Sequence, residues 1–410
     1  SAKWKYLKAV FNLEKEKIYK DRSFKKFVKD NEFWLLPYSA FCVLRDKYKT
    51  PNFNDWKTHK KYIAGKIAPF FSAKSKDYDA SMLHAWVQFQ LHKQLKDAVD
   101  YIHGLGISLK GDLPIGIYRY SVEAWAEPDL FGMDFQAGAP PDQFTEIGQN
   151  WEFPTYNWEA MKADDYRWWK NRFKALEQYF DAMRIDHILG FFRIWRMPIS
   201  ATQGILGYFY PAVPVVLDEF KARHIPFDFE RYCKPFINDE ILWKYFGEET
   251  FKALQFIHKN SDGTYQFKDE FNTQRKITDY FKDKSEDFFE KLISLCANVL
   301  FLTEEKNGET VYHPRFNVFK TESYQYLSDW ERKSIYELYQ DYFFKRQDYL
   351  WKEKAMEKLP ILLNATDMLI CGEDLGMVPD CVPEVMDELA IVALKVQRMP
   401  SGNIPSSNPK

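Results

Sequence analysis

The chain has 410 residues, of which 46% are hydrophobic and 28% charged, and its 57 basic residues nearly balance its 59 acidic ones. This composition excludes a disordered or collagen-like chain, and the near-zero net charge argues against nucleic acid as a partner. The aromatic content of 18% is high, and rings at this density either fill a large core or stack on flat ligands such as sugars.

Cysteine usage and hydropathy indicate the compartment. The five cysteines are widely spaced and include no C-x-x-C pair, which excludes a disulfide scaffold and a thiolate zinc site and favours a reducing environment. A charge-free run over 197–217 approaches the length of a membrane span, but its three prolines favour a buried or ligand-facing loop. No targeting segment is visible at Ser1, so we expect a cytoplasmic protein without membrane contact.

The first half of the chain begins with helices. Residues 1–100 carry apolar side chains at three- and four-residue steps, and a long helix is predicted over 82–101, capped by residues 79–81. Short strands are then predicted within 107–116 and 183–190. The stretch between them is interpreted as a long functional loop, rich in proline and glycine over 117–158, followed by a helix over 164–182.

The second half changes in character after residue 200. Residues 218–310 alternate helical stretches with polar turns, which we interpret as an insertion. Helical periodicity returns over 328–359, a third strand is predicted within 368–376, and a fourth over 391–400. Helices that alternate with short buried strands predict a parallel α/β sheet.

Three of the predicted strands end in an acid, namely Asp112, Asp186 and Glu373. In a parallel barrel the reactive residues lie at the carboxyl ends of the strands, which is where these acids fall. One such acid taken alone is better explained as a helix cap or a salt-bridge partner. Three acids in matching positions favour a functional site.

The neighbours of these acids indicate two different roles. Arg184 and Asp186 are two residues apart on a strand, so both point to one face, and the guanidinium keeps the carboxylate ionised, as a nucleophile requires. Glu373 follows an apolar segment, and a partly desolvated carboxyl can hold the proton of a general acid. This pair is typical of a retaining glycoside-cleaving site. A Mg²⁺ site for proton abstraction is the alternative, against which the Arg184 cation argues.

Six motifs together resemble the 4-α-glucanotransferases, also called amylomaltases or disproportionating enzymes, of glycoside hydrolase family 77. The continuations at 193–198 and 397–400 are similar to the insertion-bearing, plant-cytosolic-type branch, and the resemblance covers about 1–200 and 310–410. The motifs are Gly111-Asp-Leu-Pro-Ile-Gly116, Gly138-Ala-Pro-Pro-Asp-Gln-Phe144, Gly148-Gln-Asn-Trp151, Pro154-Thr-Tyr156-Asn-Trp158, Arg184-Ile-Asp-His-Ile-Leu-Gly-Phe-Phe192 and Gly372-Glu-Asp-Leu-Gly376.

The resemblance implies a fold and a domain organisation. We expect a (β/α)8 TIM barrel that is incomplete at both ends, because only four barrel strands are predicted. Residues 1–200 would form the first part of the catalytic barrel with a helical subdomain, 201–310 a mainly helical insertion, and 311–410 the return to the barrel.

The resemblance also implies an activity. We expect transfer of α-1,4-glucosyl or glucan units from maltose or maltodextrin to a sugar acceptor by retaining double displacement, without a metal or an organic cofactor. An α-retaining glucan hydrolase and a non-catalytic glycan-binding fragment are the alternatives.

Carried over by position, the family pattern makes Asp186 the nucleophile and Glu373 the general acid/base. The segment 138–156 is expected to help shape the sugar cleft, and stacking on sugar is expected from Trp151, Tyr156 and Trp158. Six residues in all are expected to support the nucleophile, to lie near the donor or to contact sugar. These residues are Arg184, His187, Asp112, Gln149, Trp151 and Tyr156.

Two departures from the family pattern stand out. Glu152 follows Trp151 where this branch usually has glycine, so a different local turn is expected. The family's third catalytic acid and its opening strands have no counterpart in 1–410, so we expect this chain to be a piece of a longer protein.

Overall fold

The computed structural model describes residues 2–282 and 287–396, which divide into two compact units. Unit 1 contains the residues up to Phe131 together with Tyr156–Asp186 and Ile361–Cys371. Unit 2 contains Gly132–Thr155, His187–Pro360 and the residues from Gly372 on. Each unit is described by itself below.

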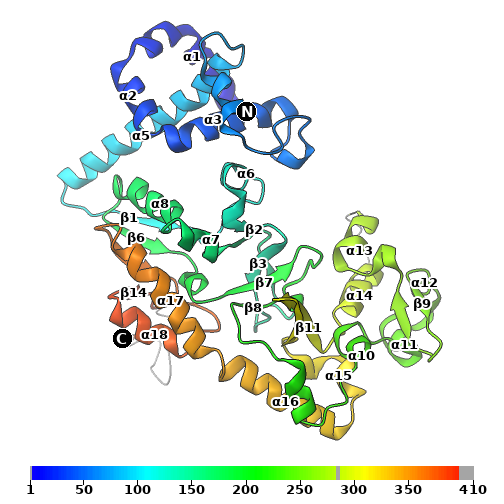
Figure 1. Cartoon of the computed structure of the whole chain (residues 1–410). Coiled ribbons are helices and arrows are strands. Elements are labelled where there is room, and N and C mark those ends of the chain that lie inside the picture. Colours follow the sequence, from blue (N-terminus) through cyan, green and yellow to red (C-terminus); the bar gives the residue numbers. More distant parts are fainter. Residues whose placement is uncertain (1, 283–286, 397–410) are drawn as a thin grey trace. The chain divides into compact units, whose positions relative to one another are not determined.

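Unit 1 begins with a helical layer, as predicted. Helices α1, α2, α3 and α5 group together in Figure 1 (blue and cyan) and enclose a core that includes Phe11, Phe24, Leu35, Trp86 and Phe89. The bounds of the helices are α1 Ala2–Lys20, α2 Arg22–Asp30, α3 Glu32–Tyr48, α4 Ala64–Ile67, α5 Tyr78–Gly104, α6 Val122–Ala126, α7 Trp158–Ala163 and α8 Arg167–Glu177.

The long helix α5 confirms the prediction of a helix over 82–101, but the predicted cap was wrong. The helix begins at Tyr78, so Asp79 and Ser81 lie inside its first turn. The Asp79 carboxylate accepts hydrogen bonds from Lys15 Nζ at 2.9 Å and from the Tyr19 hydroxyl at 2.7 Å. Asp79 therefore joins α5 to α1 instead of capping its own helix.

The strands of unit 1 form a sheet in the order β1–β6–β13, with bounds β1 Lys110–Leu113, β6 Ala182–Ile185 and β13 Leu369–Gly372. Strands β1 and β6 are parallel, and their register places Asp112 opposite Arg184. A helix precedes each of these strands, which confirms the predicted α/β class with parallel strands. The eightfold barrel stays a prediction.

Unit 2 contains an antiparallel sheet in the order β4–β3–β7–β8, followed by helices and hairpins. Short strands β2 (Phe131–Gly132) and β5 (Thr155–Tyr156) lie at the boundary between the units. The bounds in unit 2 are β3 Phe135–Ala139, β4 Gln149–Asn150, β7 Ile194–Pro198, β8 Tyr208–Tyr210, α9 Leu217–Ala222, α10 Phe229–Cys233, α11 Asp239–Phe246, α12 Thr250–Ala253, β9 Ile257–Lys259, β10 Tyr265–Phe267, α13 Gln274–Phe281, α14 Asp287–Cys296, β11 Phe301–Lys306, β12 Glu309–Pro314, α15 Glu322–Gln325, α16 Asp329–Phe344, α17 Asp348–Leu363, α18 Cys381–Glu388 and β14 Val392–Ala393.

This antiparallel sheet corrects two predicted loops. The stretch 117–158 contains α6, β3 and β4, and the charge-free run 197–217 contains the end of β7 and all of β8. Strands this short carry too few residues to show a periodic pattern, and long-range pairing with β7 orders them. The fourth predicted strand is found as β14, and residues 397–400 of that prediction lie outside the described part of the chain.

The segment predicted as a mainly helical insertion contains helices α9–α14 and two hairpins. In Figure 1 helices α11, α12, α13 and α14 gather around β9, and their shared core includes Ile241, Phe246, Phe256 and Leu292. The turns of hairpins β9–β10 and β11–β12 fall in the polar sequences around Gly263 and Gly308. The division of the chain at residues 200 and 310 stays a prediction.

A buried ion cluster joins the antiparallel sheet to the hairpin β11–β12. The Arg196 guanidinium on β7 donates to Glu304 Oε1 on β11 at 2.6 Å and to the Tyr208 hydroxyl at 3.0 Å. The other oxygen of Glu304 lies 3.0 Å from Nε2 of His313 on β12, whose ring stacks on Tyr208 at 3.9 Å. The side chains of Arg196, Glu304 and His313 are 7%, 15% and 1% exposed, so each depends on the others for its partners.

All five cysteines are free thiols, as predicted. In the part of the chain that the structure describes, no helix has both the length and the low charge needed to cross a membrane.

The close pairing of β3 with β4 generates a prediction about Gly138. A Cβ atom at this position would lie 2.0 Å from the carbonyl oxygen of Gln149, which is backbone and cannot rotate away. We expect Gly138→Ala to lower the free energy of unfolding by about 3 kcal/mol or more, because such overpacking displaces a strand. Urea unfolding measures this loss.

The matched control is Gly65→Ala in helix α4, where a Cβ would meet nothing within 4 Å. Alanine in a helix stabilises relative to glycine, so this variant should unfold at the same or a higher urea concentration. Equal stability of the two variants would contradict the predicted collision at Gly138.

Candidate active site

The first group of predicted site residues lies in unit 1, where β1 and β6 run side by side. Nη1 of Arg184 donates to both carboxylate oxygens of Asp112, at 2.9 and 2.7 Å, and Nη2 donates to Oδ1 of Asp186 at 2.8 Å. The parallel register sets Asp112 opposite Arg184, and the strand pleat sets Arg184 and Asp186 on one face. One guanidinium therefore orients two carboxylates, and the predicted proximity of Arg184 and Asp186 is confirmed.

This arrangement orients the carboxylate of Asp186 through its hydrogen bond with Arg184. The Arg184 side chain is 27% exposed and that of Asp186 is 45% exposed, so the interaction is weakened by solvent but not abolished. An ionised, oriented and accessible carboxylate can attack an electrophilic carbon.

The second group lies in unit 2, around Glu373. Its Oε2 accepts a hydrogen bond from the backbone N–H of His187 at 2.9 Å, and its Oε1 accepts one from the N–H of Leu375 at 3.1 Å. The backbone carbonyl of Glu373 accepts a third bond, from the N–H of Ile188 at 3.0 Å. Since His187 follows Asp186 directly, the carboxyl of Glu373 is held at the peptide group that comes after the proposed nucleophile.

Gly372 permits this close approach. A Cβ at Gly372 would lie 2.8 and 2.9 Å from the side chain of Ile188. A side chain here would push the end of β13 away from the segment that begins at His187. Gly372 belongs to one of the six motifs, and close packing against Ile188 explains why a glycine is needed there.

His187 is neutral in this environment. Burial, with a smaller contribution from the Arg193 cation, lowers the pKa of His187 to about 3. Its backbone is left-handed (φ 48°), and its ring meets that of Trp151 edge to face at 5.0 Å. A neutral imidazole both donates and accepts hydrogen bonds, so the expected bond to a sugar hydroxyl is chemically sound and stays a prediction.

Trp151 is fixed by its neighbours on two sides. Its indole N–H donates to Oε1 of Gln149 at 2.9 Å, and its ring stacks on Phe153 with centroids 5.6 Å apart. Both rings are partly exposed. Phe153 was not predicted from the sequence. The signal that could have found it is its aromatic side chain two residues after Trp151 in the same motif-rich segment.

Tyr156, expected to contact sugar, is placed in the core of unit 1 instead. Its ring packs against Phe131, Trp168 and Trp169, and its hydroxyl donates to the carbonyl of Ile115. Burial raises its pKa well above the usual value. With its ring 9% exposed and its hydroxyl already bonded, Tyr156 stabilises the fold rather than presenting a face to a ligand.

Glu152 shows why a glycine suits its position. Its backbone is left-handed (φ 63°), and its N–H donates to Oδ1 of Asn150 at 2.9 Å. L-residues with a Cβ adopt this conformation at a cost, whereas glycine does not. Glu152 therefore adopts the left-handed turn with strain in its backbone.

The acids of the site belong to no metal-binding cluster in the described part of the chain. Within residues 2–282 and 287–396, no group of three or more His, Cys, Asp and Glu side chains is arranged to hold a metal ion. The oxygens of Asp112 and Asp186 are instead engaged by Arg184.

A known protein family matches the chain over its whole length. A family model described as 4-alpha-glucanotransferase, glycoside hydrolase family 77, matches residues 1–410. The chain belongs to this family.

Two relatives show how the family match is distributed. The 4-alpha-glucanotransferase DPE2 of Oryza sativa subsp. japonica is 41% identical over 98% of this chain and 43% of its own length. The 4-alpha-glucanotransferase of Chlamydia pneumoniae is 32% identical over 47% of this chain and 36% of its own length. The match to the rice relative includes residues 201–310, in agreement with the predicted insertion-bearing branch. The chain spans less than half the length of these relatives.

One solved structure is similar over part of the chain. Amylomaltase from Streptococcus agalactiae in complex with acarbose matches 50% of this chain and 43% of that chain, at 26% identity and a TM-score of 0.45.

The left-handed backbone at Glu152 generates a prediction about stability. We expect Glu152→Gly to raise the free energy of unfolding by up to about 1 kcal/mol, because the strain removed exceeds the backbone entropy that glycine loses. Glu152→Val, the matched change, should lower it, because a β-branched residue is most strained at positive φ. Urea unfolding ranks the variants, and a glycine variant less stable than the valine variant would refute this explanation.

The lowered pKa of His187 generates a prediction about pH. Unfolded His187 takes up a proton below about pH 6.5, whereas the folded protein does so only near the folded pKa of about 3. The contribution of His187 to the free energy of unfolding therefore has its full value above about pH 6.5 and falls as the pH drops toward 3. His187→Asn, which accommodates the left-handed backbone, should lose less unfolding free energy between pH 7 and pH 5 than the parent chain. Equal losses would contradict the burial of a neutral imidazole.

Proposed function

We propose that the protein to which this chain belongs is a 4-α-glucanotransferase. It moves α-1,4-glucosyl or glucan units from maltose or maltodextrin to a sugar acceptor, with retention of configuration. Membership of the family supports this activity. The observation that carries it is the hydrogen bond from the His187 N–H, the peptide group after Asp186, to the Glu373 carboxyl.

The chemistry divides between these two acids. Asp186, oriented by Arg184, attacks the anomeric carbon of the donor, and the bond to the leaving oxygen breaks while Glu373 transfers its proton to that oxygen. A covalent glycosyl ester on Asp186 results. Glu373, now a carboxylate, takes the proton from an acceptor hydroxyl, whose oxygen attacks the same carbon and releases Asp186.

Transfer rather than hydrolysis requires a sugar acceptor to compete with water. The stacked rings of Trp151 and Phe153 are suited to this purpose, because their partly exposed faces are already fixed by Gln149 and by each other. A pre-organised ring pair binds a sugar with little cost in side-chain ordering. We assign the acceptor side of the site to this segment.

The fold proposed for the complete protein is a (β/α)8 barrel. The parallel pair β1–β6, with Asp112 and Asp186 at the carboxyl ends of the strands, supports this architecture. The five free cysteines support a reducing, cytoplasmic location for the protein.

The test uses the intact protein with maltotriose as donor and isotope-labelled glucose as acceptor. We expect Asp186→Ala and Glu373→Gln to lower the rate of transfer at least about 10³-fold and 10²-fold, respectively, because the nucleophile and the proton carrier are removed. Asp165→Asn, an exposed acid paired with Lys170, is the control and should retain the parent rate.

Chromatography of the labelled products decides between transfer and hydrolysis. Labelled maltose and longer oligomers support the proposal. Release of unlabelled glucose without any labelled oligomer would identify a hydrolase, and an Asp186→Ala protein with near-normal transfer would remove Asp186 as the nucleophile.

A further inference from the structure

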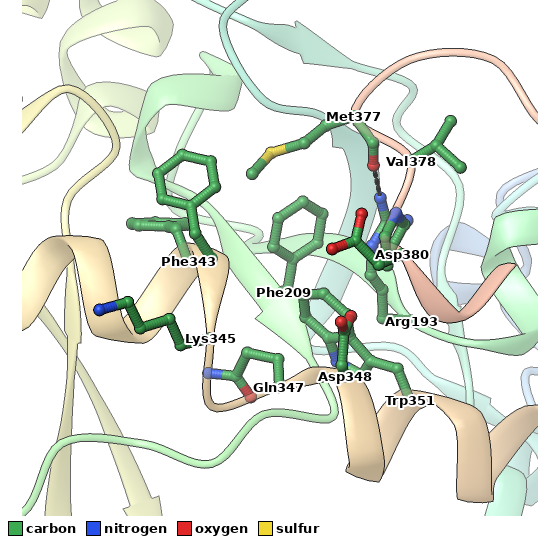
Figure 2. A pocket seen from close by; sticks show the side chains of 12 residues that line it. Arg193, Phe209, Phe343, Lys345, Gln347, Asp348, Trp351, Met377, Val378 and Asp380 are labelled. Atoms are coloured by element: carbon green, nitrogen blue, oxygen red, sulfur yellow. Dashed lines mark hydrogen bonds between the residues drawn. The ribbon is translucent and has the colours of Figure 1, made fainter.

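A pocket in unit 2 lies between strand β8, the beginning of helix α17 and the segment 377–380 that leads into helix α18 (Figure 2). Its volume is about 130 Å³. The buried side chains of Arg193, Phe209 and Trp351 line its interior, and Asp380 and Val378 are exposed where it opens. None of these residues is used in the proposed transfer reaction.

Arg193 gives the pocket an unsatisfied donor. The side chain is 3% exposed, its guanidinium lies over the rings of Phe209 and Trp351 at 4.3 and 5.4 Å, and it donates to the carbonyl of Met377. Its Nε has no hydrogen-bond partner among the described residues. Burial lowers the pKa of Arg193 to about 9. A buried N–H without a partner is unfavourable, so an oxygen atom of a ligand would be stabilised there.

The charges in the pocket wall balance. Arg193 and Lys345 carry positive charges, and Asp348 and Asp380 carry negative ones. Burial, and then the nearby charge of Asp380, raise the pKa of Asp348, which places the two carboxyls near each other. An anionic ligand would meet two carboxylates and a cationic ligand would meet two cations. The lining therefore favours a neutral ligand.

The kinds of groups present indicate a polyhydroxylated ring. Carboxylates accept hydrogen bonds from hydroxyls and the guanidinium donates to them, while the rings of Phe209, Phe343 and Trp351 supply flat apolar faces. Trp351 cannot swing away, because its indole N–H donates to the carbonyl of Pro211 at 2.8 Å. At about 130 Å³ the pocket is close in size to a cavity of about 150 Å³ that takes one benzene ring, so part of a hexose ring enters it and the rest lies at its open side.

We propose that this pocket binds one neutral hexose unit, with hydroxyls bonded to Arg193 Nε and to the carboxylates of Asp348 and Asp380. The choice of glucose, free or at the end of a maltooligosaccharide, rests on the proposed function. The pocket itself is a binding site apart from the reacting carboxylates.

Met377, which lines the pocket, provides a probe that reports on this place alone. The experiment labels the methionine methyl groups isotopically, assigns the Met377 signal with Met377→Leu, and titrates glucose and maltotriose into the chain carrying Asp186→Asn. Met161, which is fully buried, serves as the internal reference. We expect the Met377 signal to shift and saturate, with a dissociation constant on the order of millimolar.

Two variants separate specific from general effects. Asp380→Asn should weaken the binding about fivefold to tenfold, because a charged acceptor is lost. This variant keeps the start of α18, since asparagine is as good a helix cap as aspartate and the Asp380 side chain makes no cap bond. Asp218→Asn, a highly exposed acid paired with Lys221, is the matched control and should leave the affinity unchanged.

The Met377 signal distinguishes a chain end from the free sugar as the ligand. Saturable shifts with both sugars support a pocket that takes a chain end, and shifts with glucose alone support one that takes the free sugar. No shift of Met377, an equal response to L-glucose, or a response to inorganic phosphate alone would overturn the proposal. Binding is measured on the Asp186→Asn protein and transfer on the parent protein. Transfer by the parent without a Met377 shift in the variant therefore refutes only this inference, and a shift in the variant without transfer by the parent refutes only the proposed function.

Discussion

The segment that follows Asp186 is held by the two consecutive peptide N–H groups of His187 and Ile188, which both donate to Glu373. One bond reaches the side-chain carboxyl and the other the backbone carbonyl, so the position and the orientation of Glu373 are set together. The absence of a Cβ at Gly372 makes this approach feasible. The proposed chemistry depends on this contact, because it ties the second acid to the polypeptide that carries the first.

Much of this arrangement could be predicted from the sequence because it depends on local rules. An acid at the end of a short apolar strand, and an arginine two residues before it, are properties of a single strand. The pleat then requires Arg184 and Asp186 to share a face, as the structure shows. The helices of the first hundred residues were likewise predictable from their spacing, since their apolar faces pack against one another.

Other features depend on contacts between distant segments and left no local signal. Strands β3, β4 and β8 are too short for a periodic pattern and form by pairing with each other or with β7. In the sequence Tyr156 does not differ from its aromatic neighbours, yet Trp168 and Trp169 of helix α8 pack against it. Glu152 is intermediate, because its place at an expected glycine predicted a difference in the local turn but not its left-handed backbone.

The buried cluster of Arg196, Glu304 and His313 has a consequence for how the molecule unfolds. Separating the hairpin β11–β12 from the antiparallel sheet would leave Glu304 or Arg196 as a lone buried charge, and breaking such a pair costs about 3–5 kcal/mol. Strand β11 lies within the segment expected as an insertion, whereas β7 precedes that segment. Energetically the inserted chain is therefore joined to the sheet, and the two should melt in one cooperative transition rather than as separate domains.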